Sequence, residues 1–194
     1  MSPADDLPVT EFASAGDFEN WLAAEHESSA GIWLKIARKN ADIASVDYPQ
    51  ALDVALCYGW IDGQKRAADE ETHWLQRFTP RGRASKWSQV NRDKAEALIK
   101  QNRMRPAGQA EIDRAKSDGR WAAAYASSRT ATVPDDLQQA LDDDPQALAF
   151  FATLDARNRY SVLYRIGDAK KPETRAARIQ KYVAMLHDNE KIYP

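Results

Sequence analysis

Cations and hydroxyls gather in one short segment, Arg77 to Lys86, which reads Arg-Phe-Thr-Pro-Arg-Gly-Arg-Ala-Ser-Lys. A guanidinium offers a planar fork of donors that matches phosphate and carboxylate oxygens. Ser85 is a residue type that begins helices, and a helix start adds free N–H donors and partial positive charge. The segment therefore predicts a site for a phosphate, a carboxylate or a nucleic-acid backbone. The alternative is a solvated basic face that pairs with the acidic segments 1–30 and 135–144.

Further polar and aromatic residues flank this segment. Asp62 lies at a helix-to-strand turn, where a carboxylate orients arginine, serves as a general base, or only hydrogen-bonds within the turn. Trp87 and Asn91 share a helix face, which suits ligand recognition and equally suits a core hydrogen bond. We expect Asp62 to share a concave surface with Arg77 or Arg81. The candidate ligand-binding residues are Tyr58, Trp60, Asp62, Arg77, Arg81, Ser85, Trp87 and Asn91.

Signatures of common cofactor and metal sites do not occur in the sequence. His26, His73 and His187 have no metal-ligand spacing, and the single cysteine, Cys57, lies in an apolar helical run where a buried structural thiol is expected. Neither glycine-rich phosphate loop nor nucleophile elbow is present. We therefore expect no metal and no cofactor, and the pattern assigns no catalytic residue.

Charge and hydropathy restrict the environment. The net charge of −2 creates no global attraction to nucleic acid or to an anionic membrane, although residues 77–105 hold nine Lys/Arg against two acids. The first residues, Met-Ser-Pro-Ala-Asp-Asp, lack a basic and an apolar signal region, and no run approaches the ~20 apolar residues of a membrane span. The expected location is the cytoplasm.

The elements that must position these residues predict an α+β fold. Alternation and β-branched content favour strands at about 31–38, 60–67 and 72–79, with the acidic turn Asp69-Glu70-Glu71 between the last two. Helices are favoured at about 15–27 and 48–58, where capping patterns begin at Ser14 and Asp47. A third is favoured at about 86–102, where Ser85 is the cap. We expect a small antiparallel sheet of about three strands in a domain over 1–126. A helical region over 135–194 should dock on it, after a linker at 127–136.

Several ordered motifs carry a family resemblance. Cys57-Tyr-Gly-Trp-Ile-Asp-Gly63, Arg77-Phe-Thr-Pro-Arg81, Ser85-Lys-Trp-Ser-Gln-Val-Asn91, Arg103-Met-Arg-Pro-Ala-Gly108 and Ala169-Lys-Lys-Pro-Glu-Thr-Arg-Ala-Ala-Arg-Ile179 resemble the YdeI/OmpD-associated family, also called bacteriocin-protection proteins. The resemblance spans roughly residues 8–188. It implies a link to envelope stress or to resistance against cationic peptides, and it brings no catalytic residues.

Three function hypotheses follow. The first is a non-enzymatic binding protein for a small anion or an acidic partner, built from the eight candidate residues. The second is an enzyme of unknown class, with Asp62 as acid/base and Arg77 and Arg81 binding an anionic substrate. The third is a nucleic-acid binder that uses residues 77–105 and their Trp side chain.

Overall fold

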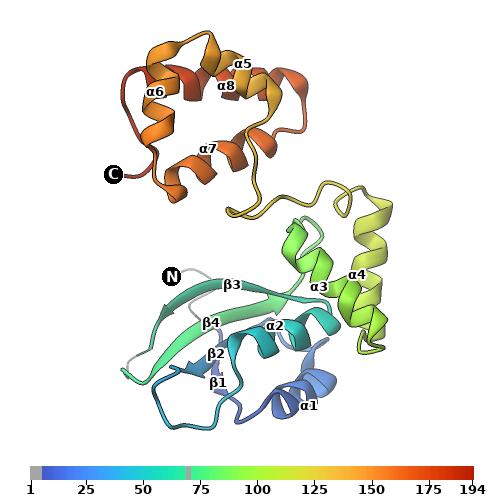
Figure 1. The fold of residues 1–194 in the computed structure, drawn as a ribbon. Helices are drawn as coiled ribbons and strands as arrows, with labels where there is room; N and C mark the ends of the chain where they lie inside the picture. The colour runs from blue at the N-terminus through green and yellow to red at the C-terminus, as the bar shows by residue number, and fades with distance from the viewer. Residues whose placement is uncertain (1–5, 69–70) are drawn as a thin grey trace. The chain divides into compact units, whose positions relative to one another are not determined.

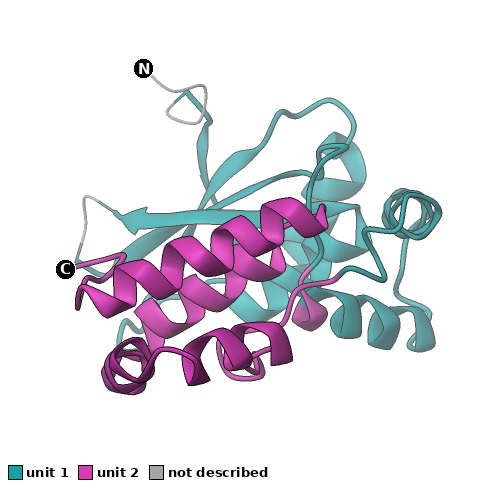
Figure 2. Ribbon diagram, turned by 90° about the horizontal axis from the view of Figure 1, so that it is seen from above, with its two compact units in different colours: residues 1–87, 91–123 teal, residues 88–90, 124–194 magenta. Residues whose placement is uncertain are grey.

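A computed structural model describes residues 6–68 and 71–194, which divide into two compact units (Figures 1 and 2). The first unit comprises Met1–Trp87 and Asn91–Ala123, and the second comprises Ser88–Val90 and Ala124–Pro194. Of the acidic turn expected at 69–71, Asp69 and Glu70 lie outside the described residues. The expected α+β fold is confirmed.

The described part of the first unit contains a sheet of four strands in the order β1-β2-β4-β3. The strands are β1 Val9–Glu11, β2 Ile32–Ala37, β3 Trp60–Ala67 and β4 His73–Pro80. β4 pairs antiparallel with β2 and β3, whereas β1 adds a parallel edge beside β2. The expectation of about three strands is corrected here. β1 is only three residues long and mostly exposed, so it lacks the alternating apolar pattern that predicts a strand.

The helices of the first unit are α1 Ala15–Glu25, α2 Tyr48–Cys57, α3 Gln89–Lys100 and α4 Pro106–Ser117. Two of the expected caps are confirmed. The Ser14 side chain accepts from the Asp17 amide at 3.2 Å, and Asp47 forms a capping box with Gln50. Phe18 of α1 packs on Phe78 of β4 with ring centroids 5.8 Å apart, so α1 covers that face of the sheet.

The expected helix start at Ser85 is wrong. α3 begins at Gln89, and Ser85 lies in a turn in which its Oγ accepts from the Gly82 amide at 3.0 Å. A serine suits such a turn as well as a helix cap, because its hydroxyl can bind local backbone in both. No helix N-terminus therefore stands behind the Arg81–Arg83 loop.

The second unit is built from helices. They are α5 Asp135–Asp142, α6 Pro145–Thr153, α7 Ala156–Gly167 and α8 Pro172–His187. Asp144 and Asp155 begin α6 and α7 by accepting from the Ala147 and Asn158 amides. These bonds hold the pKa of both carboxyls below its usual range. The core contains Leu137, Leu141, Phe151, Val162, Ile166, Ile179, Tyr182 and Leu186.

The length and hydropathy of the helices in the described residues bear on membrane insertion. None of them is both long enough and apolar enough to cross a bilayer.

Candidate functional site

Two of the sequence-predicted residues, Tyr58 and Trp60, belong to the core of the first unit. Trp60 is 1% exposed, donates from Nε1 to the His26 carbonyl at 3.2 Å, and meets the Trp21 ring edge-on. Tyr58 is buried against the His26 ring, and burial raises the pKa of its hydroxyl. Trp60 of β3 and Tyr58, which directly follows α2, therefore both contact His26 at the end of α1.

Asp62 and Arg77 lie on opposite faces of the sheet. Asp62 pairs in register with Phe78 and shares its face, so the neighbouring Arg77 points the other way. The Asp62 carboxylate accepts from the Tyr48 hydroxyl at 3.0 Å. Arg77 lies across Gly63, with Nε 2.7 Å from where a Cβ would stand. Of the two arginines that were expected to share a concave surface with Asp62, Arg77 therefore does not do so.

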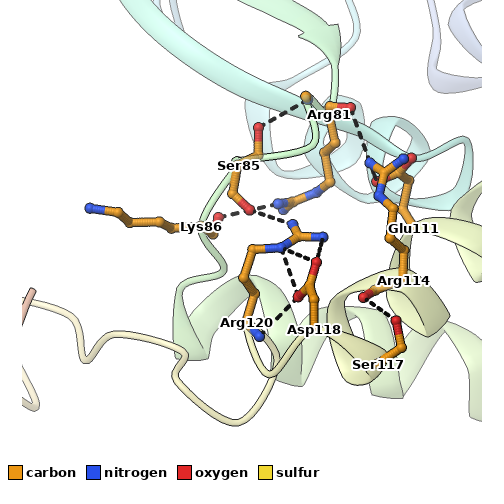
Figure 3. A network of polar contacts seen from close by, with 9 residues as sticks. Arg81, Ser85, Lys86, Glu111, Arg114, Ser117, Asp118 and Arg120 are labelled. Carbon is orange, nitrogen blue, oxygen red and sulfur yellow. Dashed lines mark hydrogen bonds and ion pairs between the residues drawn. The ribbon is translucent and has the colours of Figure 1, made fainter. Parts of the chain in front are cut away.

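Arg81 organises the segment that follows β4 (Figure 3). Its guanidinium is stacked 3.6 Å above the Trp87 ring, and the residue is only 5% exposed. Its Nη1 donates to the Lys86 carbonyl at 3.3 Å, while Nη1 of Arg120 donates to the Ser85 carbonyl at 2.7 Å. These arginines bind the backbone of the segment itself, so Arg81, Ser85 and Trp87 form a structural cluster.

We expect Arg81→Ala to lower the free energy of unfolding by about 2 kcal/mol, the size of a desolvated cation–π contact. The substitution removes the guanidinium from the Trp87 ring and leaves the Lys86 carbonyl without this donor. Urea denaturation measures the change. Arg83→Ala is the control, because Arg83 is exposed in the same loop and should leave the midpoint unchanged. Equal midpoints for the two variants would contradict the structural role.

Several other cations of the basic segment 77–105 are paired with acids. Lys94 meets Asp53 at 2.6 Å, and Arg105 meets Glu19 at 2.6 Å. The second pair joins the basic segment to the acidic segment 1–30. Asn91 is buried in α3. The cations of the basic segment thus contact different parts of the first unit, and these contacts do not bring them together in one patch.

A different group of residues lines a hollow of about 420 Å³ in the first unit. We name it the Trp74 groove, and it is lined by Arg38, Lys65, Arg66, Ala67 and Trp74. The lining comes from the end of β2 and from the β3 and β4 strands. Trp74 is partly exposed, although its neighbours Leu75 and Gln76 are buried.

The strand register explains why these side chains meet. Trp74 pairs with Ala67 and Ile36, and Lys65 pairs with Gln76, so Lys65 and Trp74 share a face. Arg38 lies two residues beyond Ile36, and its amide continues the ladder by donating to the Thr72 carbonyl at 2.8 Å. It therefore reaches the same face.

Charge in the Trp74 groove comes from Arg38 and Lys65. Arg38 donates from Nε to the Glu71 carbonyl at 2.8 Å, which fixes its guanidinium without neutralising it. Among the described residues, neither Arg38 nor Lys65 forms an ion pair with a carboxylate. The Arg66 guanidinium lies 4.2 Å above the Trp33 ring, and Trp33 belongs to the opposite face, so Arg66 contributes less to the groove.

A second hollow, of about 400 Å³, differs in its electrostatics. Its lining includes Glu11, Lys35, Thr72 and His73. Lys35 is paired with Glu11 at 3.4 Å, and the Thr72 hydroxyl lies 2.8 Å from His73 Nδ1. Its charges are therefore compensated within the hollow. In the described part of the chain, no group of three or more His, Cys, Asp and Glu side chains converges as a metal site requires.

The residues that line the Trp74 groove are not among the candidates chosen from the sequence, although all three strands that carry them were expected. Lys65 and Arg66 are consecutive cations next to an acidic stretch, a pattern typical of an ordinary solvated turn. The available signal was strand alternation combined with the correct pairing of the strands, which brings Trp74 between cations from two other strands.

Comparison with protein families gives two matches along the chain. Residues 10–111, more than half of the chain, match a domain of unknown function (DUF8412), and residues 130–189 match the family described as Bacteriocin-protection, YdeI or OmpD-Associated. The chain belongs to the family of the DUF8412 domain, which spans most of its first unit, and the match at residues 130–189 confirms the resemblance of that part to the YdeI/OmpD-associated family. No curated protein and no solved structure matches it significantly.

The two family matches divide the motifs that carried the resemblance. The motif 169–179 lies in the YdeI/OmpD-associated match, whereas the motifs 57–63, 77–81, 85–91 and 103–108 lie in the DUF8412 match. The structure gives several of these earlier motifs packing roles, through the Trp60 core contact and the Arg81–Trp87 stack. The Trp74 groove also lies in the DUF8412 match.

Proposed function

We propose that the protein is a binding protein for a small anion, which it holds in the Trp74 groove. The observation that carries the proposal is the charge of this groove: Arg38 and Lys65 face a hollow of about 420 Å³ without a carboxylate partner among the described residues. Cations in a concave, partly apolar setting attract anions more strongly than cations on a flat surface, because the surrounding protein limits solvent screening. The proposed binding site is therefore the Trp74 groove, and none of the eight residues chosen by sequence lines it.

The state of other reactive groups supports binding rather than catalysis. Burial raises the pKa of the Cys57 thiol to about 11, so the thiol is protonated at neutral pH. Burial and the neighbouring Asp62 carboxylate raise the pKa of Tyr48, whose hydroxyl remains a donor to that carboxylate. Asp62 thus has a structural partner, which weakens the hypothesis that it acts as acid/base on a substrate bound by Arg77 and Arg81.

The physiological role is a further part of the proposal. The family description names bacteriocin protection, and we propose a role in stress or antimicrobial-peptide resistance, with which a small-anion sensor or carrier is compatible. Binding of nucleic acid through residues 77–105 has less support, because Lys94 and Arg105 of that segment are paired with acids.

The proposal is tested by the melting temperature in inorganic pyrophosphate. A ligand at ten times its Kd stabilises a protein by about 1.4 kcal/mol, which raises the melting temperature by roughly 3–6 °C at this size. The concentration should stay in the low millimolar range, where non-specific stabilisation by excluded anions is negligible.

A double variant assigns the response to the groove. We expect Arg38→Gln with Lys65→Gln to remove most of the rise, because both substitutions delete charge while keeping a side chain of similar length. Arg83→Gln is the matched control, since it removes an exposed cation from another loop of the same unit. An equal response in the wild type, the double variant and the control would refute the groove as the anion site.

A further inference from the structure

We infer that the anion bound in the Trp74 groove carries a planar aromatic ring, which stacks on the Trp74 indole, so that the ligand class is a free nucleotide. The inference rests on the proposed function and adds the identity of the ligand to it. A nucleotide presents a phosphate to Arg38 and Lys65 and a base to Trp74.

The position of Trp74 is the first support. Its indole lines the groove and is partly exposed, although an aromatic ring of this size is usually buried on a helix-covered sheet face. The Tyr48 ring packs beside it with centroids 6.0 Å apart and planes tilted by 50°. Tyr48 is itself held by the hydrogen bond to Asp62, so the indole rests on a fixed support. A rigid, partly exposed ring is a suitable platform for stacking a base.

The unused polar edge of the indole is the second support. No described residue accepts a hydrogen bond from Nε1 of Trp74. An indole N–H usually finds an acceptor when it is removed from water. A ligand that covers the ring would supply one through a sugar hydroxyl or a ring nitrogen. A ligand without such an acceptor would leave this donor unsatisfied.

The size of the groove is the third support. A water molecule occupies about 30 Å³ of liquid, so 420 Å³ exceeds the volume of an inorganic phosphate ion several-fold. The volume falls in the range of about 300–1,000 Å³ that small-molecule sites occupy. Beyond Arg38 and Lys65 the lining consists of the apolar Trp74 and Ala67 and of Arg66, whose guanidinium lies over the Trp33 ring. The groove therefore matches a ligand with one anionic end and one planar apolar end.

Isothermal titration calorimetry of the full chain with three probes tests the inference. The probes are adenosine 5′-monophosphate, adenosine, and inorganic pyrophosphate, which separate the ring from the charge. We expect the nucleotide to bind at least ten-fold more tightly than either of the other two, because stacking of one base on an aromatic side chain is worth about 5- to 150-fold in affinity. Pyrophosphate binding as tight as the nucleotide would overturn the inference and leave the proposed function intact. If neither phosphate probe binds, both fail.

Two variants show whether Trp74 makes the difference. Trp74→Leu should reduce nucleotide affinity about ten-fold and leave pyrophosphate affinity unchanged, whereas Lys65→Gln should weaken both. Because Trp74→Leu also removes the packing of Tyr48, Trp74→Phe serves as a second variant that keeps a ring, and it should bind the nucleotide more tightly than Trp74→Leu. Equal nucleotide affinity in wild type and both variants would overturn the stacking role. A single-stranded oligoadenylate that bound ten-fold more tightly than the mononucleotide would overturn the assignment to a free nucleotide.

Discussion

A chain that ends at Lys170 is expected to lose the fold of its second unit. The truncation removes α8, which supplies Ile179, Tyr182 and Leu186 to the core of this unit. Burial of Ile179 and Leu186 alone contributes about 3–6 kcal/mol, because each such side chain contributes about 1.5–3 kcal/mol. That loss is comparable with the whole net stability of a small domain. The helices left behind would expose Leu141 and Phe151 to water.

The tryptophans offer a readout that separates the two units. The six Trp residues all precede residue 122 and therefore lie in the first unit, so tryptophan fluorescence reports that unit alone. Far-ultraviolet circular dichroism of the truncated chain should lose more helical signal than the 16 residues of α8 account for. Lys181→Ala, at an exposed position of α8, is the control and should keep the full signal. Retention of α5, α6 and α7 in the truncated chain would show that α8 is an appendage.

Most of the fold could be predicted from local sequence signals. The caps at Ser14 and Asp47 are side-chain to backbone bonds within three residues, so the local sequence contains all that determines them. β3 spans Trp60–Ala67, as its pattern predicts. The spacing of Ala176, Ile179, Val183 and Leu186 predicts one apolar face of the last helix. This face is correct at Ile179 and Leu186, whereas Ala176 is exposed and Tyr182 is buried. Tyrosine carries a polar group, and periodicity alone does not show that its ring is buried.

The candidate site was much less predictable, because it depends on strand pairing. A β-bulge lies between Asp62 and Lys65, because over this stretch β3 advances by three residues while β4 advances by two. As a result Asp62 and Lys65 share a face, although strict alternation would place them on opposite faces. Alternation alone assigns Lys65 to the wrong face and separates it from Trp74. Sequence patterns also gave no reason to prefer Arg38 over the more clustered cations Arg81 and Arg83.

Gly108→Ala is expected to lower the free energy of unfolding by about 3 kcal/mol, the upper end for overpacking a close-packed site. Gly108 lies in the first turn of α4, directly against the end of α2. A Cβ at this position would stand 2.7 Å from the Leu56 carbonyl oxygen and still closer to the Cys57 carbonyl oxygen. Both are backbone atoms of a helix end, so they cannot rotate away as a side chain would. Chemical denaturation of the variant measures the loss.

Gly16→Ala is the matched control for this effect. Gly16 also lies in a first helical turn of the same unit, but a Cβ there would meet only the Ser14 Oγ at 3.6 Å, which is ordinary contact. Alanine is the better helix former, so the control should be neutral or more stable by up to about 1 kcal/mol. The expected difference in the free energy of unfolding between the two variants has one cause, the close approach of α4 to α2. The same approach brings the Arg105 amide to the Cys57 carbonyl at 3.2 Å, and a Cβ at Gly59 would stand 3.0 Å from the Ala107 carbonyl oxygen. It therefore joins the motif 57–63 to the motif 103–108. A Gly108→Ala variant as stable as Gly16→Ala would show that these motifs do not depend on backbone contact.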